Sequence, residues 1–154
     1  MDSLRQLIRR KPQIFLIISL VYIFITGILK WHTSFVWDMV WFPLGGLLGV
    51  YFLDAAELFF AVSPSPFRSI FFMALYSIVG FFVVSSSANG FGSGVVLIVY
   101  LQLLLWQYGQ WKVQGNLDSW FRVPTGSVPI VTQRAALLAF VGVLLLQTYF
   151  FIRS

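Results

Sequence analysis

Five long apolar runs, separated by short polar segments, constrain this chain more than any other feature of its sequence. They cover residues 13–29, 35–53, 67–84, 94–110 and 135–152. A helix of about 20 residues crosses the ~30 Å hydrocarbon layer of a membrane, and each run has that length or nearly so. The sequence therefore predicts an all-α integral membrane protein, a bundle of about five transmembrane helices, with four and six as alternatives. The fourth run reaches a full span only if Gln107 and Tyr108 are included.

The composition supports a lipid environment and a single domain. Hydrophobic residues make up 59% of the 154 residues and charged residues 10%, whereas soluble domains have about 45–50% and about 25%. Since almost no chain remains outside the apolar runs, we expect residues 1–154 to form one transmembrane domain. The absence of cysteine excludes disulfides, thiolate metal sites and thiol catalysis.

The distribution of basic residues predicts the orientation in the membrane. If the N-terminus is cytoplasmic, eight basic residues lie on the cytoplasmic side: Arg5, Arg9, Arg10, Lys11, Arg68, Lys112, Arg122 and Arg134. Only Lys30 and Arg153 lie on the opposite side. Positive charge concentrates on cytoplasmic loops, so we expect a cytoplasmic N-terminus, an uncleaved signal anchor as first helix, and a C-terminus on the opposite side. Specific binding of acidic lipid headgroups is the alternative explanation of these charges, and a nucleic-acid partner is not expected because they form no separate patch.

The segment 112–134 is the longest stretch outside the apolar runs and is expected to be a cytoplasmic loop. Residues 116–122 could form a short interfacial helix, with Trp120 and Phe121 dipping into the membrane and Pro124 ending it. Loops often carry function, so a partner-binding role stands beside that of a plain connector.

Asp38 is the acidic residue most suggestive of chemistry, because a carboxylate inside a bilayer is costly. Glu57 lies 19 positions further along the same run, about 28 Å at about 1.5 Å per residue. Asp38 can therefore lie at the outer interface while Asp54 and Glu57 lie at the inner one. Proton or cation handling, or an ion pair with Lys30 or Arg153, are the alternatives.

The same run contains Gly45 and Gly49 in a G-x-x-x-G pattern, on one stripe with Asp38. Small residues at this spacing let a neighbouring helix approach closely. We expect this stripe to pack within the subunit, or alternatively against another subunit, although a kink at Pro43 would rotate its two halves.

Asp54 and Glu57 are three positions apart and share a helix face. Paired carboxylates can perform acid–base chemistry or hold a divalent cation. Two oxygen donors alone make a poor metal site, so solvation of a helix end is the simpler interpretation.

Gln102, Trp106 and Gln110 follow one another at steps of four and lie on one face of the fourth run. The amide of Gln102 lies deep in an apolar segment and needs a hydrogen-bonding partner there. Three residues of the first run could provide it: Ser19, Tyr22 and Thr26. Structural bonding between helices is expected, and lining of a polar pathway is the alternative.

Small residues recur in the third run, at Ala74, Ser77 and Gly80, and in the fifth, at Ala135, Ala139 and Gly142. They predict close packing of these helices within the bundle.

The sequence gives no catalytic motif, metal-ligand cluster or phosphate-binding loop, and no cofactor is expected. His32, the one histidine, is expected to be a solvated loop residue. We therefore expect a non-catalytic, multi-pass subunit or assembly partner of a larger membrane complex, bound to lipids and to other membrane subunits or to itself. A small homo-oligomeric channel or transporter, with Asp38 and Gln102 near a polar path, is the alternative. A lipid-modifying enzyme that uses Asp54 and Glu57 is a lesser one.

Overall fold

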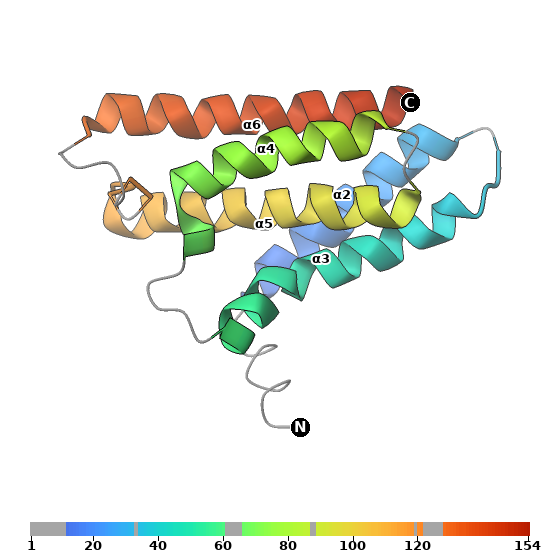
Figure 1. Cartoon of the computed structure of the whole chain (residues 1–154), viewed down its shortest axis with the longest axis horizontal. Helices are drawn as coiled ribbons and strands as arrows, with labels where there is room; N and C mark the ends of the chain where they lie inside the picture. The colour runs from blue at the N-terminus through green and yellow to red at the C-terminus, as the bar shows by residue number, and fades with distance from the viewer. Residues whose placement is uncertain (1–11, 33, 61–65, 87–88, 119, 122–127) are drawn as a thin grey trace.

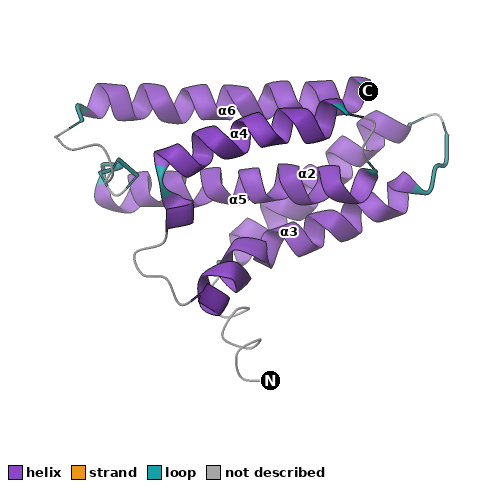
Figure 2. Ribbon diagram, in the orientation of Figure 1, coloured by secondary structure: helices purple, strands orange, loops and turns teal. Residues whose placement is uncertain are grey.

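The structure, a computed structural model, describes residues 12–32, 34–60, 66–86, 89–118, 120–121 and 128–154. Within these segments all regular structure is helical (Figure 2). The α-helices are α2 (Gln13–Trp31), α3 (Asp38–Phe60), α4 (Ile70–Ser85), α5 (Gly90–Gln114) and α6 (Ile130–Arg153), and a 3-10 turn, η1 (Pro66–Arg68), precedes α4. Four of the five α-helices are long and apolar enough to cross a membrane, and α4 is a shorter apolar helix. The all-helical class predicted from the sequence is therefore confirmed.

The predicted bounds of four helices were wrong. Helix α3 continues to Phe60 and α6 begins at Ile130, beyond the expected ranges 35–53 and 135–152. The fourth apolar run, expected at 94–110, forms α5, which is the longest described helix with 25 residues. The third run, expected at 67–84, forms α4, which has only 16 residues. Hydropathy marks where a segment is apolar, whereas helix ends depend on capping groups. Those of α5 lie beyond its apolar run, and the N-cap of α4, Ser69, lies inside its run.

Three capping residues set these ends. Asn89 accepts a hydrogen bond from Gly92 N at 2.9 Å and starts α5, while Gly115, at φ 72°, ends it in the left-handed conformation that glycine adopts without a Cβ penalty. Ser69 accepts a hydrogen bond from Phe72 N at 3.2 Å and starts α4 after η1. Polar residues 107–114 therefore continue α5 well past its apolar part.

Helix α5 lies at the centre of the bundle. In Figure 1 it runs between the α2–α3 pair on one side and α4 and α6 on the other. Every residue from Leu97 to Leu104 is buried. A helix buried on all sides needs no polar face, which explains why this segment shows no amphipathic pattern.

Two pairs of glycines bring α3 and α5 into backbone contact. Gly45 and Gly49 lie on α3, and Gly90 and Gly94, at the same spacing, lie on α5. A Cβ atom on Gly45, Gly49, Gly90 or Gly94 would meet the carbonyl oxygen of Phe91, Val95, Asp38 or Phe42, respectively. Each helix thus presents its glycines to the backbone of the other. The glycine stripe predicted on the second apolar run packs within the chain.

The two helices joined by these glycines run in the same direction (Figure 1). Asp38 lies opposite Gly90, and Gly49 lies opposite Val95, so the residue numbers rise together along the contact. Pro43 does not interrupt α3, and the residues on both sides of it contact α5.

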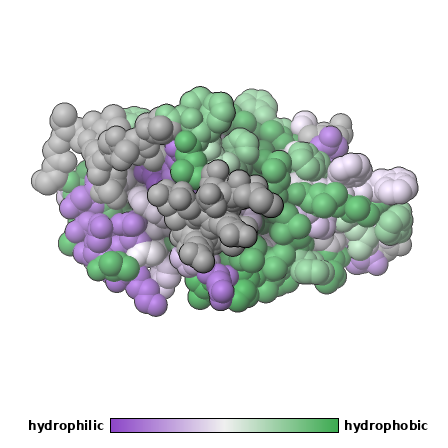
Figure 3. All heavy atoms as spheres, turned by 90° about the horizontal axis from the view of Figure 1, so that it is seen from below, coloured by the Kyte–Doolittle hydropathy of each residue, from purple (hydrophilic) through white to green (hydrophobic). Residues whose placement is uncertain are grey.

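The surface of the bundle is largely apolar. Figure 3 shows hydrophobic side chains over the middle of the molecule, with most of the visible hydrophilic surface toward the end where α5 finishes. Of the most apolar window of α2, and likewise of α6, only 17% is buried, against 67% for α5. The outer helices therefore expose most of their apolar side chains.

A glycine-to-alanine pair tests the glycine contact. In Gly45→Ala the new methyl group would overlap the Phe91 carbonyl, and overpacking of this kind costs about 1–3 kcal/mol or more. In Gly27→Ala, the control on α2, the methyl group meets no atom within 4 Å, and better helix propensity should stabilise by up to about 1 kcal/mol. Free energies of unfolding in mixed detergent micelles measure both. Equal changes in the free energy of unfolding in the two variants would contradict the backbone contact between α3 and α5.

Candidate functional site

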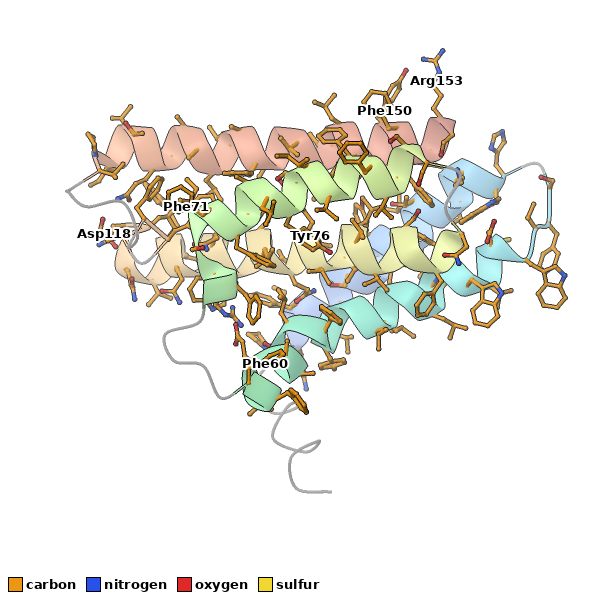
Figure 4. The ribbon with its side chains drawn as sticks, viewed as in Figure 1. Phe60, Phe71, Tyr76, Asp118, Phe150 and Arg153 are labelled. Carbon is orange, nitrogen blue, oxygen red and sulfur yellow. The ribbon has the colours of Figure 1, made fainter. Side chains whose placement is uncertain are left out.

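Polar side chains gather at three levels along α5. An N-terminal cap (Asp38 and Gly90) lies at its start, and an arginine clamp (Asp54, Glu57, Arg68 and Trp106) lies toward its end. A central belt of serine, threonine, tyrosine and glutamine side chains lies between them, and Tyr76, labelled in Figure 4, marks its place between α4 and α5. These three clusters contain most of the residues singled out from the sequence.

The arginine clamp joins α3, η1 and α5 through one guanidinium group. Arg68 Nε donates to Glu57 Oε1 at 2.7 Å, and Arg68 Nη2 donates to Asp54 Oδ1 at 3.2 Å. The same guanidinium lies 4.5 Å from the centre of the Trp106 ring, in cation–π geometry. The carboxylate pair predicted from the spacing exists, but its two members bind an arginine.

Arg68 is the residue of this cluster that sequence reasoning missed. The sequence contains a usable signal, because the distribution of basic residues predicts Arg68 on the same membrane side as Asp54 and Glu57, and its charge is opposite to theirs. Gln107, whose Nε2 lies 3.5 Å from the Arg68 carbonyl oxygen, supports the same turn. Gln110, on the face predicted to continue from Trp106, is half-buried.

The N-terminal cap gives Asp38 a structural partner. Asp38 Oδ1 accepts a hydrogen bond from Gly90 N at 3.0 Å, where the free N–H groups at the start of α5 favour a negative charge. Among the described residues no salt bridge joins Asp38 to Lys30 or Arg153, although the negative charge of Asp38 acts on Lys30. Glycine packing brings the Asp38 carboxylate close to the α5 N-terminus.

Lys30 binds the C-terminal end of α6. Its Nζ donates to the Phe151 carbonyl oxygen at 2.5 Å and lies 4.5 Å from the centre of the Phe151 ring. A cation is favourable there because the last carbonyl groups of a helix lack partners within it. Trp31, Phe42 and Phe151 pack together beside it, with ring centres 4.8 to 5.9 Å apart. This contact joins α2, α3 and α6 at one end of the bundle.

In the central belt, Gln102 contacts the first of its three expected partners. Gln102 Nε2 donates to Ser19 Oγ at 2.5 Å, and Ser19 Oγ donates in turn to the Phe15 carbonyl oxygen at 2.7 Å. Both side chains are buried. The bond joins α5 to α2, as the structural interpretation of Gln102 predicted.

Further hydrogen bonds of the belt join the remaining helices around α5. Tyr22 and Thr148 connect α2 to α6, and Tyr76 OH donates to the Val96 carbonyl oxygen between α4 and α5. Tyr100 OH donates to the Phe140 carbonyl oxygen at 2.9 Å and connects α5 to α6. Hydrogen bonds therefore link α2, α4, α5 and α6 inside the apolar part of the bundle.

Glutamine is the main buried polar residue of the described chain. Gln102, Gln107, Gln133 and Gln147 are at most 4% exposed. Gln147 Nε2 donates to the Ser77 carbonyl oxygen at 2.9 Å, and its amide lies against Gly80, where a Cβ atom would come within 2.7 Å of Nε2. Sequence reasoning missed Gln147, although the argument applied to Gln102 holds equally for an amide in the fifth apolar run.

The small residues of the last two helices behave differently from each other. On α4, Ser77 and Gly80 are buried, as predicted, but Ala74 is exposed, so for that residue the prediction was wrong. On α6, Ala135 and Ala139 are exposed, and a Cβ atom on Gly142 would meet nothing within 4 Å. The prediction that the small residues of the fifth run pack within the bundle was wrong, because α6 turns its glutamines inward and this face outward.

The segment between α5 and α6 is organised by Gln133. Its Oε1 accepts from Leu117 N at 2.8 Å, and its Nε2 donates to Asp118 Oδ1 at 2.7 Å. The expected interfacial helix over 116–122 lies partly outside the described residues, and the described ones form turns. Trp120 and Phe121, expected to dip into the membrane, are only 1% and 9% exposed and pack within the protein.

Comparisons of the chain with protein-family models, with curated proteins and with solved structures found no match. The geometry of the chain itself is therefore the basis for assigning its function.

A double-mutant cycle tests the central belt. Ser19→Ala and Gln102→Met each remove one partner of the bond between α2 and α5, and their coupling energy should be about 0.6 kcal/mol and at most about 1.7 kcal/mol, as for other hydrogen bonds between membrane helices. Unfolding free energies in detergent micelles give this coupling. Ser19→Ala combined with Tyr76→Phe is the control, since Tyr76 bonds elsewhere, and it should show no coupling. Additive effects of Ser19 and Gln102 would contradict the bond.

Proposed function

We propose that the chain is an integral membrane protein that crosses the bilayer five times, with its N-terminus in the cytoplasm. Four helices of sufficient length and hydropathy support four of the crossings. The parallel arrangement of α3 and α5 supports the fifth, because α4 then has to return the chain across the membrane. The 16 residues of α4 span about 24 Å at about 1.5 Å per residue, and local thinning of the bilayer accommodates a short helix at modest cost.

Within that membrane we propose a non-catalytic role, as a subunit or assembly partner of a larger complex. The side chains best suited to catalysis or ion binding support this role, because each of them already binds another group of the chain. Asp38 binds the start of α5, Asp54 and Glu57 bind Arg68, and Gln102 binds Ser19. Each of these contacts stabilises the bundle.

The outward face of α6 is the observation that carries the proposal. We call it the small-residue face: Thr132, Ala135, Ala139 and Gly142. Gly45 and Gly49 show how this chain uses small residues, since they admit another helix to backbone contact. Thr132, Ala135 and Ala139 are exposed and the Cβ direction of Gly142 is open. Small residues promote close helix packing in lipid, so this face fits a helix of a partner subunit.

The alternatives have weaker support. A channel or transporter would use Asp38 and Gln102 along one path, but Asp38 lies between α3 and α5 while Gln102 lies between α5 and α2. A lipid-modifying enzyme would need Asp54 and Glu57 available as acid and base, and both bind the Arg68 guanidinium. We therefore propose the assembly role ahead of both.

Site-specific photo-crosslinking in the native membrane tests the assembly role. A photoreactive residue at Ala139 should join the chain to a discrete second polypeptide, because a partner helix packs on the small-residue face. The same residue at Phe24, which is 67% exposed on α2, is the control and should give only lipid adducts. Mass spectrometry of the adducts identifies the partner.

Two outcomes would contradict this assignment. An adduct of twice the 17.6 kDa chain mass would assign the face to a second copy and favour the homo-oligomeric alternative. Lipid adducts alone at both positions would show that no subunit covers α6.

A further inference from the structure

We propose that Arg134 and Lys112 together bind the phosphate of an anionic phospholipid at the cytoplasmic end of the bundle. This site rests on the proposed membrane insertion and is separate from the subunit contact proposed for α6. Arg134 lies near the start of α6 and against Trp111 of α5, and Lys112 follows Trp111 in the last turn of α5. Their surroundings fit one lipid molecule in three respects: charge, hydrogen-bond donors and apolar contact.

Arg134 is held by an aromatic ring and leaves its donors available. Its guanidinium carbon lies 5.5 Å from the centre of the Trp111 ring, and the residue is exposed. A guanidinium that stacks on a ring still presents its N–H groups at its edge, and its planar fork matches the oxygens of a phosphate. Trp111 thus orients Arg134 for an anion that arrives from outside the chain.

The charge balance at this end favours an anion. Arg68 has two carboxylate partners, but neither Arg134 nor Lys112 has one among the described residues. Asp118 is the acidic residue nearest in sequence, and its Oδ1 accepts a hydrogen bond from Gln133. The described residues of this end therefore include two cations without a carboxylate partner, and one carboxylate that already has a donor.

The start of α6 adds further donors. Its N-cap residue, Pro129, makes no side-chain cap, and the first turn contains no acidic residue. The first N–H groups of a helix lack partners within it and carry partial positive charge. These N–H groups and Arg134, which lies one turn further along α6, all favour an anionic ligand.

Exposed apolar side chains next to these cations indicate a lipid as the source of the phosphate. Val113 is 85% exposed, Val131 is 80% exposed and Ile130 is 56% exposed. Val113 follows Lys112 on α5, and Ile130 and Val131 precede Arg134 on α6. A phospholipid can place its phosphate on the cations and its acyl chains on these residues, whereas a soluble phosphate would leave them uncovered.

Arg153, at the other end of α6, provides an internal comparison. It also lies against an aromatic ring, 5.8 Å from the centre of Tyr149, but its Nη1 donates to Tyr149 OH at 2.5 Å. It lies at the C-terminal end of the helix, where the last carbonyl groups repel an anion. Figure 4 shows Arg153 pointing away from the bundle, at the opposite end from Asp118. Arg153 should therefore bind no lipid phosphate.

Lipid competition measured by native mass spectrometry tests this site. The full chain in detergent receives equal amounts of phosphatidylglycerol and phosphatidylcholine, and the ratio of the bound lipids is the readout. Wild type should retain phosphatidylglycerol preferentially. Lys112→Gln and Arg134→Gln should each lower the ratio about 5-fold and together about 30-fold, the effect of about 1 kcal/mol per basic residue near a membrane surface.

Three controls make the result specific. Arg153→Gln, which removes an equal charge from the same helix, should leave the ratio unchanged, and an equal loss in this variant would overturn the site. Arg134→Lys keeps the charge but not the planar fork, and it should retain part of the preference. Displacement of phosphatidylglycerol by millimolar inorganic phosphate would also overturn the proposal, since it would indicate a site for free phosphate.

Membrane insertion is measured separately in the same preparations. A chain that stays in the membrane fraction after alkaline carbonate extraction but shows no lipid preference would overturn the lipid site alone. A chain released by carbonate would overturn the proposed membrane insertion, and the lipid site with it.

Discussion

The backbone contact between α3 and α5 is the constraint on which the rest of the structure depends. Gly45 and Gly94 lie where no side chain fits between the two helices, and this approach places Asp38 beside the free N–H groups of α5. Helix α3 packs against α5 and α2, while α2, α4 and α6 all pack against α5. The burial of α5 on all sides and the outer position of α6 follow from this central pair.

The polar residues of the bundle are used largely to join its helices. In water a hydroxyl or amide has solvent as an alternative partner, whereas in hydrocarbon it has only other protein groups. The hydrogen bond between Gln102 and Ser19 therefore joins α5 to α2, and the one between Gln147 and Ser77 joins α6 to α4. The same reasoning separates packing from function: residues bound inside the chain stabilise it, whereas the proposals of a partner and of a lipid rest on exposed features, the small-residue face and Arg134.

The sequence predicted the class of fold and the residues that join helices better than it predicted helix ends and helix partners. The apolar runs, the Gly45–Gly49 stripe and the buried amide of Gln102 each give a strong local signal. The clamp around Arg68 depends on how α3, η1 and α5 converge, which no single segment encodes. On α6, small residues lie on one face and glutamines on another, and periodicity alone does not decide which face turns inward.

The sides of the membrane on which Ser34 and Gln114 lie test the central claim most directly. Both residues are exposed, and the natural chain has no cysteine, so Ser34→Cys and Gln114→Cys each carry one thiol for a membrane-impermeant reagent. Parallel α3 and α5 require three crossings between these positions. The account predicts that Ser34→Cys reacts in intact cells and that Gln114→Cys reacts only after permeabilisation. Labelling of both from the same side would mean that α4 does not cross, and would contradict the parallel pair at the centre of the fold.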